Sequence, residues 1–109
     1  MISKLTGGVM TVITAIVAAT LISTTAGADP ANGEVLARRW CATCHVVAPD
    51  QTRANADVKP FAAIARSPDF NRDKLAFFLL DPHPKMPSLT LTRREAIDLA
   101  DYIGSLAKP

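Results

Sequence analysis

The sequence predicts a small all-α domain of three or four helices, and three observations support this fold class. Apolar residues recur at helical spacing in several segments after residue 29. Residues that commonly start helices precede those segments. No stretch alternates apolar and polar residues in the manner of a half-buried strand. A chain of 109 residues is long enough for one such domain at most.

The first predicted helix follows Asp29-Pro30, because aspartate can cap a helix and proline suits its first position. We expect this helix to run from residue 31 into Cys44. Leu36, Trp40 and Cys44 are spaced four apart and would then share one face.

Two shorter helices are predicted in the middle of the chain, after a polar loop over residues 46–59. One spans residues 60–66 and begins at a proline. The next spans residues 72–80, with Asn71 as its cap. The apolar stripe of this third helix is expected to consist of Leu75, Phe78 and Leu79.

The last predicted helix begins at Thr92-Arg93-Arg94-Glu95, which has the S/T-x-x-E pattern of a capping box. An apolar pattern at helical spacing follows this box. Its members are Ala96, Leu99, Ala100 and Ile103.

Residues 1–28 have the order of a secretory signal peptide. Lys4 is followed by an uncharged, mostly apolar run over residues 9–22, and Ala26-Gly27-Ala28 supplies small residues for cleavage. A buried helix or an uncleaved membrane anchor is the alternative, but the run is short for a membrane span. We expect export to the periplasm, cleavage after Ala28, no stable membrane insertion afterwards and one domain over residues 29–109.

The charge balance argues against a nucleic-acid partner. The chain has 12 basic and 10 acidic residues, and Lys4 would leave with the signal. Nucleic-acid-binding domains usually carry a strong basic excess.

Residues 41–45, Cys-Ala-Thr-Cys-His, form the most informative motif. On a helix, Cys41, Cys44 and His45 would share one face. Two thiols could then bond to the two vinyl groups of a haem while the imidazole reaches its iron, and C-x-x-C-H is the attachment motif of c-type haem. The sequence therefore predicts one covalently bound haem c, with His45 as an iron ligand.

Other uses of this motif are a redox-active dithiol, a disulfide and a zinc site. A dithiol of the thioredoxin type usually lies near a βαβ pattern, which is absent from the sequence. A disulfide leaves His45 unexplained. Zinc would need four ligands, which Cys41, Cys44, His45 and His83 could supply, but the second half lacks paired ligand spacing.

Met86 is the expected second axial ligand of the iron, because methionine opposite histidine is common in electron carriers. It is the one methionine after residue 28, and prolines at 82, 84 and 87 stiffen its loop. His83 is the competing ligand and would lower the reduction potential relative to a thioether.

On these motifs the chain resembles the small soluble class I c-type cytochromes of bacteria. Residues 41–45 resemble the haem-attachment motif and residues 85–87 the methionine loop of that family. The resemblance implies that Gly33 and Tyr102 meet where the first and last helices cross. It also implies that the carbonyl of Pro60 accepts the second N–H of His45. Lys59 stands where many relatives have glycine.

The expected function is periplasmic electron transfer between redox partner proteins, not enzymatic catalysis. The iron would cycle between Fe(III) and Fe(II), with His45 and Met86 as axial ligands. Two alternatives remain at this point. If Met86 did not bind the iron, an open site could bind gases or react with peroxide. The chain could also be the cytochrome subunit of a periplasmic dehydrogenase.

Overall fold

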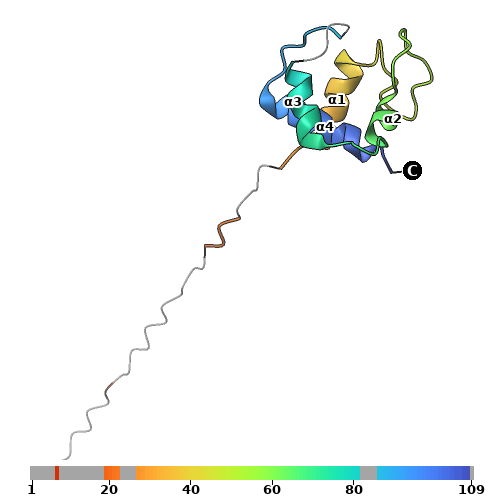
Figure 1. Cartoon of the computed structure of the whole chain (residues 1–109). Helices are drawn as coiled ribbons and strands as arrows, with labels where there is room; N and C mark the ends of the chain where they lie inside the picture. The colour runs from red at the N-terminus through yellow and green to blue at the C-terminus, as the bar shows by residue number, and fades with distance from the viewer. Residues whose placement is uncertain (1–6, 8–18, 23–26, 82–85, 109) are drawn as a thin grey trace, which may run out of the picture.

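Four α-helices and no strand are formed by the residues that the computed structural model describes, which are 7, 19–22, 27–81 and 86–108 (Figure 1). The all-α fold predicted from the sequence is confirmed. The helices are α1 (Pro30–Trp40), α2 (Phe61–Ala65), α3 (Arg72–Leu80) and α4 (Arg93–Ser105). Helix α4 packs against each of the other three, so it forms the centre of the domain (Figure 1).

Helix α1 begins as predicted but ends earlier. The Asp29 side chain accepts a hydrogen bond from the backbone N–H of Asn32, and Pro30 occupies the first turn. The helix stops at Trp40 rather than at Cys44. There the backbone N–H of Ala42 donates to the carbonyl of Ala37, five residues back, so the regular ladder ends. Trp40 is 54% exposed and does not share the buried face of Leu36.

Helices α2 and α3 lie close to their predicted positions. Pro60 is the N-cap of α2, and the Asn71 side chain caps α3 by accepting from the backbone N–H of Lys74. The predicted apolar stripe of α3 is wrong at Phe78, which is exposed. Ala76 and Leu79 are the buried residues of this helix, because they lie on the face that packs against α4.

Helix α4 has the predicted start and the predicted buried face. Its capping box is complete, since the backbone N–H of Glu95 donates to Thr92 Oγ1 and the backbone N–H of Thr92 donates to Glu95 Oε2. The four apolar residues of the pattern are all buried in the core; they are Ala96, Leu99, Ala100 and Ile103.

Helices α1 and α4 cross in close contact at Gly33. A Cβ atom at this position would lie 2.1 Å from the backbone oxygen of Asp98 and 2.7 Å from the Cβ of Tyr102. Only glycine can therefore occupy this position without displacing backbone. The expected meeting of Gly33 and Tyr102 is confirmed.

Two sequence-based expectations concern segments outside the described residues. Most of the expected signal peptide belongs to them, as do residues 82–85, which include His83. The described residues 19–22 lie apart from the helical body and are exposed (Figure 1). None of the helices among the described residues is both long and apolar enough to cross a membrane.

Candidate haem site

The segment Cys41–His45 forms a tight turn directly after α1. The backbone N–H groups of Cys44 and His45 both donate to the carbonyl of Cys41, at 3.1 and 2.9 Å. These bonds keep the three chemistry-bearing side chains within one turn, although the helix itself has ended. Both thiols are free; Cys41 is buried and Cys44 is partly exposed.

A backbone carbonyl fixes the imidazole of His45. Its Nδ1 lies 2.8 Å from the carbonyl oxygen of Lys59. A carbonyl can only accept, so Nδ1 carries a proton, and in the neutral imidazole Nε2 then presents a lone pair. This is the tautomer that a metal-binding histidine needs.

The expectation that Pro60 supplies this carbonyl is wrong by one residue. The Pro60 carbonyl accepts instead from the backbone N–H groups of Ala63 and Ile64, in the first turn of α2. The carbonyl of the preceding residue, Lys59, is left to receive the imidazole N–H. Phe61, the first residue of α2, also packs against His45 with the ring centres 5.2 Å apart.

Gln51 organises the backbone around His45, and sequence reasoning did not single it out. Its Nε2 lies within 2.8–2.9 Å of the carbonyl oxygens of Ala42, His45 and Arg53. Its Oε1 accepts from the backbone N–H of Val47 at 2.9 Å. One side chain thus holds both ends of the turn that carries Cys44 and His45.

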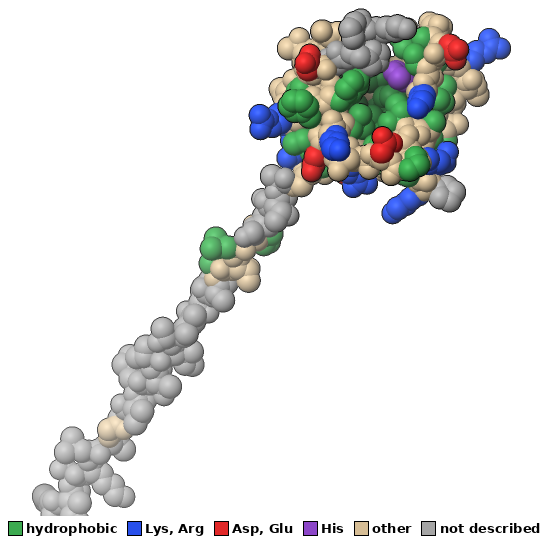
Figure 2. Space-filling model, in the orientation of Figure 1, with side chains coloured by type: hydrophobic (Ala, Val, Ile, Leu, Met, Phe, Trp, Pro, Cys, Tyr) green, Lys and Arg blue, Asp and Glu red, His purple; other side chains and the backbone are tan. Residues whose placement is uncertain are grey.

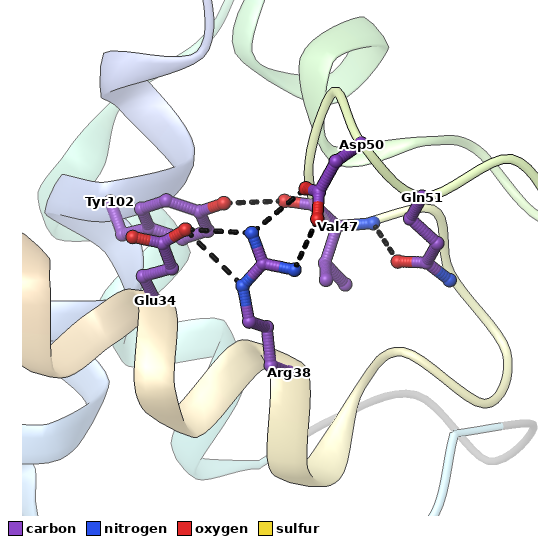
Figure 3. A network of polar contacts seen from close by, with 6 residues as sticks. All are labelled: Glu34, Arg38, Val47, Asp50, Gln51 and Tyr102. Atoms are coloured by element: carbon purple, nitrogen blue, oxygen red, sulfur yellow. Dashed lines mark hydrogen bonds and ion pairs between the residues drawn. The ribbon is translucent and has the colours of Figure 1, made fainter.

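Further polar contacts join this loop to two helices (Figure 3). Arg38 of α1 lies between Glu34 and Asp50 and pairs with both, at 2.9 and 2.8 Å. The guanidinium holds the pKa of the Asp50 carboxyl below its usual value. Tyr102 of α4 donates to the Val47 carbonyl at 2.6 Å, and burial raises the pKa of its phenol. The loop after His45 is therefore attached to both α1 and α4.

Met86 is partly buried and packs against the apolar core cluster of the domain. Its side chain is thus directed toward the protein rather than into solvent. His83, the competing ligand, lies outside the described residues.

A curated relative decides the family. Cytochrome c-552 of Bradyrhizobium diazoefficiens is 63% identical over 84 residues, which are 77% of this chain and 81% of the relative. The chain belongs to the class I c-type cytochromes. No protein-family model matches it. As a c-type cytochrome, the chain carries one covalently bound haem c with iron and serves electron transport.

The side chains of this cytochrome fit the haem group. The chain offers two free thiols in one turn, an imidazole with an unprotonated Nε2, and a thioether against the core. Apolar side chains line a hollow on the face where a histidine side chain is visible (Figure 2). Covalent attachment, one axial nitrogen and one axial sulfur are the requirements of a haem c with His/Met ligation.

The zinc and dithiol interpretations fit the cytochrome less well. Within the described part of the chain, no three His, Cys, Asp or Glu side chains converge in a way that could hold a metal ion. Burial and the neighbouring Cys44 raise the pKa of the Cys41 thiol to about 11. A redox-active cysteine needs the thiolate, which a raised pKa disfavours.

Proposed function

We propose that the protein is a periplasmic electron carrier in which Cys41 and Cys44 attach the haem and His45 and Met86 are the axial ligands of its iron. When bound, haem supplies the one-electron Fe(III)/Fe(II) couple. The observation that carries the proposal is the hydrogen bond from His45 Nδ1–H to the Lys59 carbonyl, which leaves Nε2 unprotonated for a metal.

Different residues attach the haem, orient the imidazole and supply the second iron ligand in this proposal. The turn at 41–45 brings two thiols and one imidazole together, and Gln51 holds the backbone of that turn. The Lys59 carbonyl orients the ring of His45 and increases its electron donation to a metal. Met86 supplies a thioether, which raises the reduction potential relative to a second histidine.

Occupation of both axial positions of the iron would distinguish an electron carrier from a protein that binds gases or reacts with peroxide. With Met86 as the second ligand, no iron position would be left for a gas or for peroxide, and electrons would pass through the haem edge. The packing of Met86 against the core favours this arrangement over an open site. Donor and acceptor would be separate redox proteins that dock transiently. A role as the cytochrome subunit of a dehydrogenase would need a separate enzyme to co-purify with the chain.

Export to the periplasm is the second part of the proposal. Residues 1–28 would serve as a signal peptide cleaved after Ala28, and residues 29–109 would form the cytochrome domain. Leu21 and Ile22 are 92% and 84% exposed, which supports their assignment to a segment that does not contribute to the domain core.

Absorption spectroscopy of the exported protein tests the ligands. We expect a reduced c-type α band that survives acid–acetone extraction, and the weak red-end band of methionine-ligated ferric haem. Met86→Ala should abolish the weak band because the thioether is lost. His83→Ala is the matched control in the same loop and should keep it.

The opposite results would redirect the assignment. A native protein with covalent haem but without the weak band would favour His83 or an open sixth position. Binding of carbon monoxide by the reduced native protein at neutral pH would favour the gas-binding alternative.

A further inference from the structure

Asp98 is a buried charged residue at the crossing of α1 and α4. It is 2% exposed, and no other charged residue among the described ones is buried. A buried carboxylate needs hydrogen bonds and a compensating positive charge, because burial removes its hydration. The site is separate from the turn that carries Cys41, Cys44 and His45.

Among the described residues, Asp29, Asn32 and Arg94 contact this carboxylate. The backbone N–H of Asp29 donates to Oδ1 at 2.8 Å, and the amide Nδ2 of Asn32 donates to Oδ2 at 2.9 Å. Both donors are neutral in the full-length chain. Arg94 supplies a positive charge, but its Nε lies 3.4 Å from Oδ1, and its side chain is 49% exposed. Arg94 also donates to the carbonyl of Gly27.

The closest neutral donor is the nitrogen of the peptide bond between Ala28 and Asp29, which is the bond that we propose to be cleaved. Hydrolysis breaks this C–N bond, places the hydroxyl of water on the Ala28 carbonyl carbon and gives its hydrogen to the Asp29 nitrogen. At neutral pH the new amine binds a further proton and becomes an ammonium.

We propose that Asp98 is the binding site for the mature N-terminus, so that signal removal creates an ion pair between the α-ammonium of Asp29 and the buried Asp98 carboxylate. The inference rests on the proposed cleavage after Ala28. The contact already exists in the full-length chain at 2.8 Å, and cleavage changes its donor from neutral to charged. Charge-assisted hydrogen bonds are roughly twice as strong as neutral ones.

The local structure explains why the chain needs this partner. The Asp29 side chain caps α1, so the new ammonium lies at the positive end of that helix. A cation there is unfavourable with the helix dipole, and the Asp98 carboxylate compensates for it. Cleavage also removes the Gly27 carbonyl that Arg94 contacts. Asp29, Arg94 and Asp98 are the charged groups that meet at this site.

A comparison of two holoproteins tests the proposal. One is exported with its natural signal. The other is exported with the cleavage site moved upstream, so that Ala26-Gly27-Ala28 remains and the Asp29 nitrogen stays an amide. Each is made with Asp98 and as Asp98→Asn, and the midpoint and slope of denaturant unfolding are measured. We expect Asp98→Asn to lower the folding equilibrium constant about tenfold more in the naturally processed protein than in the extended one.

The intact mass of the exported protein tests the cleavage after Ala28 separately from the ion pair between Asp29 and Asp98. A start other than Asp29 in the naturally exported protein would contradict the cleavage and the ion pair together. A start at Asp29 with equal effects of Asp98→Asn in both proteins would overturn the ion pair alone.

A second measurement needs no substitution at Asp98. Acetic anhydride should acetylate the α-amine of Asp29 about tenfold more slowly than the α-amine of Ala26 in the extended protein, because the Asp98 carboxylate holds the Asp29 nitrogen as a hydrogen-bonded ammonium, which is not nucleophilic. Equal rates would contradict the proposal.

Discussion

At the scale of single residues, the candidate haem site depends on backbone carbonyl groups and on the side chains that bind them. His45 is oriented by the carbonyl of Lys59, and Gln51 binds the carbonyls of Ala42, His45 and Arg53. Every residue has a backbone carbonyl, so the amino-acid type at a position does not reveal whether its carbonyl takes part in the site. The geometry of the candidate site therefore depends on residues outside the Cys-x-x-Cys-His motif as well as on those within it.

Replacement of Gln51 should loosen the turn that carries Cys44 and His45. Gln51→Ala leaves part-buried backbone groups without their partner, and we expect a loss of about 1–3 kcal/mol in the free energy of unfolding. Chemical denaturation of the holoprotein measures this loss. Thr52→Ala, at the exposed neighbouring position, is the matched control and should change stability by less than about 0.5 kcal/mol. A Gln51→Ala protein as stable as the Thr52→Ala protein would contradict the organising role.

At the scale of the elements, the crossing of α1 and α4 sets the architecture. The backbones approach so closely at Gly33 that no side chain fits, and Tyr102 of α4 continues from there to the Val47 carbonyl. Helix α1, which precedes the turn at residues 41–45, is thereby fixed against the central helix of the domain. Any change in this crossing would move the turn as well.

A methyl group at the crossing should be costly. Gly33→Ala places Cβ against backbone atoms of α4, which cannot yield without separating the helices. We expect a loss of about 3 kcal/mol in the free energy of unfolding, the upper end of the usual cost of overpacking. Gly104→Ala is the control, because its Cβ would meet the movable Arg72 side chain at 2.5 Å. Thermal unfolding of both holoproteins should show the larger loss in Gly33→Ala; similar losses would contradict the close-packing argument.

The sequence predicts elements well where the signal is local. The Asn71 cap and the Thr92–Glu95 capping box gave the starts of α3 and α4, because such boxes bond within a few residues. The end of α1 was predicted wrongly, since no glycine or proline marks it. The exposure of Phe78 depends on which face of α3 packs against α4. The spacing of apolar residues along α3 does not determine this face.

For the candidate site, the sequence supplies the residues that stay predicted as haem-binding. Cys41, Cys44 and His45 follow from a motif whose chemistry requires that spacing, and Met86 from the ligation class that the motif implies. The roles of Gln51 and of the Lys59 carbonyl were not predictable, because both involve backbone atoms, and the sequence does not indicate which backbone atoms take part. These contacts become visible only when the loop is folded.

At the scale of the whole molecule, one aromatic side chain links the central helix to the loop after His45. The Tyr102 hydroxyl must stay protonated to donate to the Val47 carbonyl. Burial is the main cause of the raised pKa of this phenol. Since a single small domain unfolds cooperatively, the ionisation of Tyr102 acts on the stability of the entire fold.

Alkaline pH should therefore destabilise the protein through Tyr102. The pKa of Tyr102 is higher in the folded protein than in the unfolded chain, where it is about 10. The protonated phenol therefore makes its full contribution to the free energy of unfolding below about pH 10. This contribution is lost as the pH rises through the pKa of the folded state. Tyr102→Phe should cost about 1–2 kcal/mol at neutral pH and remove this part of the alkaline decline. Denaturant unfolding between neutral pH and pH 11 measures both effects. An unchanged alkaline decline in Tyr102→Phe would contradict the assignment.

Because the acceptor at position 59 is a backbone carbonyl, the orientation of the His45 ring does not depend on which side chain residue 59 carries. Every amino acid has this carbonyl, so the residue at 59 can change without removing the acceptor of His45. Lys59 itself is exposed, and lysine is a basic residue. The charge of the side chain at this exposed position can therefore change while the orientation of the His45 ring is retained.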